Sequence, residues 1–174
     1  MSEVEEIVWQ GKFLAAKRKG KWEYVSRTRG VSAAVILAIV EGDVLLVEQD
    51  RAPLKRRCLE LPAGLVGDEQ EGEAVETAAA RELEEETGYR AGRIVELGRF
   101  YASPGMSSEH FTLLRADELV KIGEGGGIGS EQIDVHRVPL IEVPEFVERK
   151  RRQGVAIDVK LLILLAGTLL AGES

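Results

Sequence analysis

Near-continuous apolar runs mark the centre of the predicted sheet. Residues 32–40 read SAAVILAIV and residues 44–49 read VLLVEQ, with the turn EGD ahead of the second run. A hairpin of two almost wholly apolar strands is typical of a sheet that is covered on both faces. A shorter strand, LELPAG, follows at 59–64 and ends in a proline and glycine loop.

Strand-like patterns also occur before and after this hairpin. EIVWQG and KWEYVSRT, separated by the basic turn KRKGK, predict a small β appendage within residues 1–30. RIVELGRFYA, HFTLLRA and IDVHRVPL predict three later strands, and helices are expected at roughly 142–153 and 156–171. The class is therefore mixed α/β, with helices packed on a mixed sheet and one domain at 31–174.

The clearest helix covers residues 73–87 and is closed by Gly88, the residue preferred for a left-handed C-terminal cap. Its sequence includes RELEEETGY, where like charges crowd the wrong end of a helix dipole. At 100° per residue, Glu82 and Glu86 fall on the same stripe as Ala79 and Leu83, which faces the sheet. Glu76 and Glu84 point the other way and fit a solvated face.

The carboxylates of Glu82, Glu85 and Glu86 are therefore expected to project toward one partly buried site. Desolvation and mutual repulsion would protonate such a cluster unless a cation compensated for its charge. Oxygen-only ligands suit hard ions such as Mg²⁺, with Mn²⁺ as a substitute, and Arg81 is placed to orient the set. A divalent ion would neutralise a diphosphate and activate a water molecule for attack on phosphorus.

Composition and charge limit the kinds of molecule that the protein is expected to bind and where it is expected to reside. The chain has 174 residues, 44% of them hydrophobic, and a net charge of -7, which argues against binding nucleic acid through its phosphates. The single cysteine, Cys58, cannot form an intramolecular disulfide, and the charged start MSEVEE lacks a signal-peptide pattern, so a cytoplasmic location is expected. The apolar run at 161–171 is too short for a membrane span and predicts a buried terminal helix.

The spacing of Glu73, Arg81, the following glutamates and Gly88 resembles the Nudix box, G-x5-E-x7-R-E-U-x-E-E-x-G-U. Gly67 supplies the first glycine at the literal spacing. In the relatives that this chain resembles, the glycine of PAG, here Gly64, takes that place, followed by the insertion LVG. That alignment gives the carbonyl of Ala63 the family's backbone metal-ligand role.

The flanking motifs VLLVEQDR, ELPAG and SPGMSSE resemble the ADP-ribose pyrophosphatases and related nucleoside diphosphate sugar hydrolases. The resemblance implies a Nudix α/β/α sandwich, a small-molecule substrate and a homodimer that exchanges N-terminal strands. It implies metal ligation by Glu82, Glu85 and Glu86, with Glu85 also in a catalytic role, and an ion pair of Glu73 with Arg81 that braces the helix.

The resemblance also implies residues that bind the substrate. Arg51 matches a position that contacts the diphosphate, and Glu109 one that recognises the terminal ribose, in a loop shaped by Pro104 and Gly105. Glu131 aligns with a catalytic glutamate on a loop that the glycines of GEGGGIG would make flexible, with Glu124 as its rival.

Two further residues are candidates from their chemistry. Trp22 is suited to stack on adenine and Arg29 to donate several hydrogen bonds to the nucleotide. A buried structural tryptophan is the alternative for Trp22. His136 is expected to be a surface or core residue rather than a ligand.

Three functions follow from these motifs. The leading hypothesis is Mg²⁺-dependent hydrolysis of ADP-ribose to AMP and ribose 5-phosphate. The same chemistry on another nucleoside diphosphate sugar, such as GDP-mannose, is the nearest alternative, since its base and sugar contacts are not readable from the sequence. A non-catalytic Nudix sensor of ADP-ribose is the third, although it predicts a damaged box, and the box here is intact.

Overall fold

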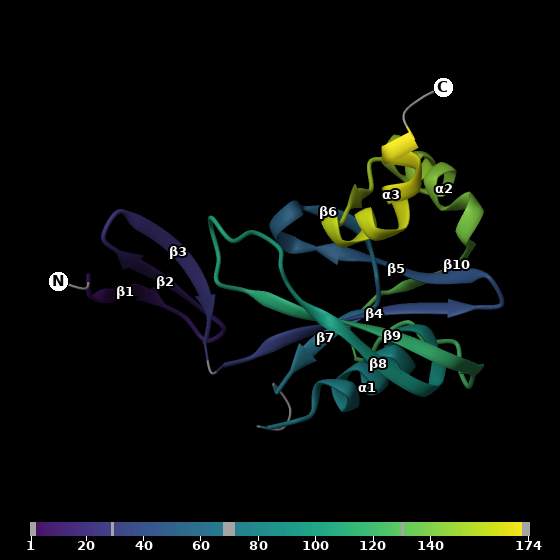
Figure 1. The fold of residues 1–174 in the computed structure, drawn as a ribbon, viewed down its shortest axis with the longest axis horizontal. Helices are drawn as coiled ribbons and strands as arrows, with labels where there is room; N and C mark the ends of the chain where they lie inside the picture. The colour runs from purple at the N-terminus through teal and green to yellow at the C-terminus, as the bar shows by residue number, and fades with distance from the viewer. Residues whose placement is uncertain (1–2, 29, 68–71, 130, 172–174) are drawn as a thin grey trace.

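The computed structural model describes residues 3–28, 30–67, 72–129 and 131–171 (Figure 1). The N-terminal strands are β1 (Glu5–Gln10), β2 (Leu14–Lys19) and β3 (Trp22–Arg27). The central strands are β4 (Ser32–Val40), β5 (Asp43–Arg51), β6 (Arg56–Glu60), β7 (Ala63–Val66), β8 (Tyr89–Tyr101), β9 (His110–Lys121), β10 (Asp134–Pro139) and β11 (Ala156–Ile157). The helices are α1 (Val75–Thr87), α2 (Val143–Arg152) and α3 (Leu162–Ala171).

The central sheet is mixed. Its strand order is β11-β6-β5-β4-β9-β8, with β10 paired to β5 and β7 paired to β4. The pairs β4 with β9 and β11 with β6 are parallel, and the other pairs are antiparallel. The turn at Glu41 and Gly42 has positive φ angles of 52° and 88°, which fits a tight hairpin.

Each face of this sheet is covered by helix (Figure 1). Along β5, Leu45 joins the cluster that holds Ala79 and Leu83 of α1, whereas Leu46 joins the cluster that holds Val147 of α2. Alternate residues of one strand therefore enter two different cores, which explains the continuous apolar pattern. The expected sandwich of helices around a mixed sheet is confirmed.

The strands β1 to β3 form a separate antiparallel sheet beside this body (Figure 1). It is joined to the loop between β8 and β9 by main-chain hydrogen bonds. The N–H of Val25 donates to the carbonyl of Met106 at 2.9 Å, and the N–H of Ser108 donates to the carbonyl of Val25 at 3.0 Å. The loop is thus fixed along the edge of the N-terminal sheet.

Two features of the secondary structure differ from what the sequence predicts. The stretch KRKGK is not mainly a turn, because Lys17, Arg18 and Lys19 belong to β2 and only Gly20 and Lys21 connect it to β3. Two of these basic residues are matched across the sheet by acidic partners of β1, Lys17 by Glu5 and Arg18 by Glu6. The two-residue strand β11 was not expected at all.

The last helix also differs from its expected burial. Leu161 and Leu165 are buried, but Leu169 is 62% exposed and Leu170 is 87% exposed. One side of α3 packs on α2 and the core, while the other side faces outward. Within the described residues, the helices are too short to form an apolar segment that spans a bilayer.

Candidate active site

Helix α1 carries the acidic residues to the edge of the sheet. Ala78, Ala79 and Leu83 are fully buried against the sheet, and this packing offsets the unfavourable charge at the helix end. Gly88 ends the helix with φ at 72°, and its N–H donates to the carbonyl of Glu84 at 2.9 Å. The predicted C-terminal cap is therefore present, and the helix begins two residues later than expected.

The glycine-rich loop after β9 covers the end of α1. Gly126 and Gly127 donate their N–H groups to the carbonyls of Glu86 and Glu85, at 2.8 and 3.0 Å. A Cβ atom on Gly125 would lie 2.5 Å from the carbonyl oxygen of Glu86, and Gly125 has a φ of 70°. The glycines were expected to make a flexible lid. In the structure, Gly125 allows close approach to the helix, whose terminal carbonyls the loop satisfies, and the flexibility of the loop stays a prediction.

The three glutamates lie on one side of α1 but bond to different partners. Arg81 donates from Nη1 to Glu82 at 2.9 Å and to Glu85 at 3.2 Å. Glu86 instead accepts from the N–H of Ala63 at 3.0 Å. Among the described residues, His, Cys, Asp and Glu side chains do not gather in groups of three that could hold a metal ion.

The carboxyl of Glu86 is strongly affected by its burial. Its side chain is only 5% exposed, and burial raises its pKa to about 8. The N–H of Ala63 and the charge of Arg51 lower this pKa, while the charges of Glu82 and Glu131 raise it. Burial is the largest of these effects and favours the neutral carboxyl, so the ionised form would need a cation close by to stabilise its charge.

Gly64 leaves the space that the carboxylate of Glu82 needs. A Cβ at this position would lie 1.8 Å from Cδ of Glu82, so no other residue fits without moving the glutamate. Gly67 has a different requirement, a φ of 83°. Glu73 lies 3.6 Å from Nε of Arg81, which matches the bracing pair expected from the box.

These residues fit a hard divalent cation. Glu82 and Glu86 offer carboxylate oxygens from one helix face, and Mg²⁺ is commonly held by one or two carboxylates, with water and phosphate as its other ligands. Glu85 lies close to Glu82, because Nη1 of Arg81 donates to both carboxylates. For Ala63, the contact that the structure shows is made by its N–H, not by the carbonyl expected to bind metal.

Arg51 lies at the end of β5, on the side of the sheet that α1 covers. Its guanidinium donates from Nε and Nη2 to the two carboxylate oxygens of Glu60, at 2.6 and 2.7 Å. The charges of Glu60 and Glu86 both raise the pKa of Arg51. Glu60 was missed by sequence reasoning, although a lone acidic residue inside the apolar stretch CLELP was a usable signal.

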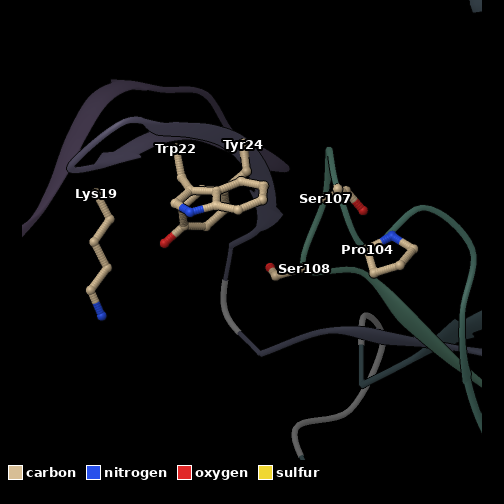
Figure 2. A pocket seen from close by; sticks show the side chains of 7 residues that line it. Lys19, Trp22, Tyr24, Pro104, Ser107 and Ser108 are labelled. Carbon is tan, nitrogen blue, oxygen red and sulfur yellow. The ribbon is translucent and has the colours of Figure 1, made fainter.

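A pocket of about 300 Å³ lies between the N-terminal sheet and the loop before β9. Figure 2 shows Trp22 and Tyr24 on one side, with Pro104, Ser107 and Ser108 on the other. Trp22 is 56% exposed, so the alternative of a buried structural tryptophan is wrong. Gly105 also lines this pocket, while Arg29 lies outside the described residues.

Glu109 lies beneath the same loop, where it binds Arg27 of β3. The oxygen Oε1 of Glu109 is 2.6 Å from the guanidinium of Arg27, and both side chains are partly buried. The residue predicted to recognise the terminal ribose therefore also fastens the loop to the N-terminal sheet.

The two candidates for the loop base differ clearly. Glu131 contributes negative charge at Glu86, and its carboxylate accepts from the N–H of Ile128 at 3.0 Å. Glu124 has a side chain that is 92% exposed and pairs with Lys121 at the surface. The charge of Glu131 acts on Glu86, which favours Glu131 over Glu124, and its role as the base stays a prediction.

Other polar residues serve the fold. Glu48 is 5% exposed and is held by Lys150 at 2.6 Å and by Arg57 at 2.8 Å. His136 also contacts Glu48, at 3.1 Å, which agrees with its expected structural role. Cys58 is buried, and burial raises the pKa of its thiol to about 12.

The fold is an α/β/α sandwich in which the glutamate-rich helix α1 lies near the ion pair of Arg51 with Glu60. Comparison with known proteins identifies the family. The NUDIX domain model matches residues 28–156, and the chain belongs to the Nudix family.

Individual relatives agree with this assignment. The ADP-ribose pyrophosphatase of Bacillus subtilis (strain 168) is 37% identical over 120 residues, which cover 68% of this chain and 63% of that protein. The GDP-mannose pyrophosphatase of Cronobacter sakazakii is 34% identical over 153 residues, covering 83% of this chain and 76% of that protein. The match to the Bacillus subtilis protein thus spans less than two thirds of its length.

A solved structure shares the fold. The crystal structure of an ADP compounds hydrolase superposes with a TM-score of 0.71 and covers 98% of this chain and 94% of that chain. At 21% sequence identity, this similarity concerns the fold alone.

Proposed function

We propose that the protein is an Mg²⁺-dependent Nudix pyrophosphohydrolase that splits ADP-ribose into AMP and ribose 5-phosphate, with Mn²⁺ as an alternative ion. One observation carries this proposal: on the α1 face of the sheet, the buried carboxyl of Glu86, which accepts from the N–H of Ala63, lies close enough to the guanidinium of Arg51 for their charges to interact. A diphosphate needs both features, a site for a cation and a directed guanidinium.

Each residue then has a defined task. Glu82, Glu85 and Glu86, with the carbonyl oxygen of Ala63, would hold the ion, whose chemistry is to neutralise the diphosphate and lower the pKa of water. Arg51 donates hydrogen bonds to a phosphate oxygen. Water attacks one phosphorus, Glu131 accepts its proton, and the bond from that phosphorus to the bridging oxygen breaks.

The nucleoside would occupy the pocket shown in Figure 2. Trp22 and Tyr24 supply aromatic faces for a purine, and Pro104 and Gly105 bound the opposite side. A volume of about 300 Å³ is at the small end of the range for ligand sites and suits one end of a dinucleotide-sized substrate. The name of the Bacillus subtilis relative supports ADP-ribose.

GDP-mannose is the second candidate substrate and should be compared directly with ADP-ribose. The Cronobacter sakazakii relative is a GDP-mannose pyrophosphatase and aligns over 83% of this chain, more than the 68% of the Bacillus subtilis relative. Initial rates should be measured with ADP-ribose, GDP-mannose and other nucleoside diphosphate sugars, with the products identified by chromatography. Faster turnover of GDP-mannose would replace the first choice, and no Mg²⁺-dependent turnover of any of them would leave the sensor hypothesis.

We also propose that residues 1–30 form an appendage to a hydrolase domain at 31–174 and join two copies in a homodimer by strand exchange. Apolar side chains of this sheet are exposed, among them Ile7 at 54% and Trp9 at 60%. Light scattering after gel filtration should give twice the chain mass, and Trp9→Lys should lower it. A cytoplasmic location is proposed as well, supported by the unpaired thiol of Cys58.

A further inference from the structure

The antiparallel strands β5 and β6 carry two glutamate–arginine pairs of opposite orientation, each with a buried carboxylate. Glu48 of β5 binds Arg57 of β6, and Arg51 of β5 binds Glu60 of β6. Glu48 and Glu60 are 5% and 4% exposed. The first pair lies on the face that α2 covers, where Lys150 joins it, and the second on the face of α1, where the charge of Glu86 acts on Arg51.

The two pairs differ in which other contacts the arginine makes. In the Glu48 pair, Nη2 of Arg57 also donates to the main-chain oxygen of Glu48 and to Asp134, both at 2.7 Å. In the other pair, Glu60 engages Nε and Nη2 of Arg51 in a two-point contact. A guanidinium has five N–H groups, so three of those of Arg51 are not used by Glu60.

The two side chains of the Arg51–Glu60 pair differ in exposure, so the arginine is the end that faces outward. The carboxylate of Glu60 is the inner end, with its side chain 5% exposed, while the side chain of Arg51 is 42% exposed. A two-point contact fixes the plane of the guanidinium as well as its position, which one hydrogen bond cannot do. The N–H groups that Glu60 does not bind therefore point away from the pair in one fixed direction.

We propose that Glu60 is a positioning residue, which orients the guanidinium of Arg51 so that its remaining donors meet a diphosphate. This inference rests on the proposed function, because it assigns the phosphate contact to Arg51. Glu60 itself touches no substrate. Its charge reduces the net attraction of the site for an anion, so its contribution is orientation rather than affinity.

The test is a double-mutant cycle on the full chain with ADP-ribose and Mg²⁺. Glu60→Gln keeps the shape but replaces one acceptor by an NH₂ group that opposes the donors of Arg51. We expect kcat/KM to fall by roughly 10- to 100-fold, the range for a small misplacement of a reacting group. In an Arg51→Lys background, the same change should alter kcat/KM by less than about twofold, because the group it positions is gone.

The matched control is Glu48→Gln, which breaks the other glutamate–arginine pair of the same two strands. Both variants leave an arginine without its carboxylate, so both should lower the melting temperature. Only Glu60→Gln should lower kcat/KM at a temperature where all variants are folded. An equal loss of kcat/KM in both variants, or an undiminished effect of Glu60→Gln in the Arg51→Lys background, would overturn the assignment.

A spectroscopic measurement on the wild-type protein makes the test independent of turnover. The Nε–H signal of Arg51 in a nitrogen-15 spectrum of the wild-type protein, assigned by its loss in Arg51→Lys, should exchange slowly with water. Rapid exchange would show that Glu60 does not hold the group, which also overturns the inference. A slow signal in a protein without diphosphate hydrolysis would instead refute the proposed function alone.

Discussion

Arg27 of β3 and Glu109, which directly precedes β9, form an ion pair that joins the N-terminal sheet to the central sheet, with 2.6 Å between the guanidinium and Oε1. It reinforces the main-chain contacts of Val25 with Met106 and Ser108. The wall of the pocket around Trp22 therefore depends on a contact between segments 82 residues apart.

Glu109→Gln is expected to weaken substrate binding more than it weakens the fold. The pair is partly exposed, so its loss should cost at most about 1 kcal/mol of unfolding free energy. Its role in holding the loop and the expected ribose contact should raise KM for ADP-ribose by about tenfold, with a smaller effect on kcat. Steady-state kinetics and urea unfolding measure the two effects.

Glu6→Gln is the matched control, since Glu6 pairs with Arg18 on the exposed side of the same sheet. It should leave KM unchanged. A KM for Glu109→Gln equal to that of the wild type would contradict a role in the pocket.

Gly125→Ala is expected to damage the site through the end of α1. Its Cβ would lie 2.5 Å from the carbonyl of Glu86, and φ at this position is 70°, so the loop must move. We expect a loss of about 1–3 kcal/mol in stability and a fall in kcat of more than about tenfold.

Gly129→Ala is the control for Gly125→Ala, because it introduces backbone strain without a close contact. Gly129 has a similar φ of 64°, but a Cβ added there would meet no other atom of the described residues within 4 Å. This variant should lose stability through strain and retain most of its activity. Equal losses of kcat in the two variants would argue that contact with α1 is unimportant.

Mg²⁺ should stabilise the protein against heat, and Glu86→Gln should remove most of this effect. A ligand at 100 times its dissociation constant stabilises by about 2.7 kcal/mol if it binds only the folded state. The same variant should lose more than about 100-fold in kcat, since even partners of metal ligands cost 10- to 100-fold. Melting curves with and without Mg²⁺ provide the first measurement.

Glu84→Gln is the control on the same helix. Glu84 binds Arg90 at 2.6 Å and lies away from the proposed site, so its substitution should preserve both activity and metal-dependent stabilisation. If Glu84→Gln removes the stabilisation and Glu86→Gln does not, the assignment of the ligands is wrong.

Acid should weaken the fold through Glu48. Burial alone would raise its pKa, but hydrogen bonds from Lys150, Arg57 and His136 outweigh burial and lower the pKa from 4.5 to about 2. The resulting stability is fully present above about pH 4.5 and is lost as the pH falls toward 2. A pKa change of this size corresponds to about 3 kcal/mol.

Urea unfolding at several pH values would measure this contribution. Glu48→Gln should be less stable than the wild type at pH 7, and the difference should shrink between pH 4.5 and 2. A constant difference across this range would mean that Glu48 does not titrate as described.

Local patterns predicted the elements whose causes are local. The apolar period of α1, its end at Gly88 and the hairpin at Glu41 and Gly42 each follow from residues close in the chain. The strand β2 was misread because its charges are matched only across the sheet, as in the pair of Lys17 with Glu5. Contacts of this kind depend on register, which the sequence of one strand does not contain.

The same limit applies to the site. The spacing in RELEEETGY indicated which glutamates share a helix face, because helix geometry is fixed. It did not indicate that Glu60 would hold Arg51, or that Ala63 would reach Glu86 from 23 residues away. These contacts arise only when β6, β7 and α1 are packed together.

The docking of the glycine loop on α1 also limits how this protein can vary. At Gly88 and Gly125, an added Cβ would lie 2.2 and 2.5 Å from a main-chain oxygen of the opposite segment. A library randomised over the loop would therefore return glycine at Gly125, whereas at Gly129, where the surroundings are open, another residue would cost only the backbone strain of its positive φ. Selection for altered substrates would then find its freedom in the loop around Pro104 and in the N-terminal sheet, with the end of α1 inherited unchanged.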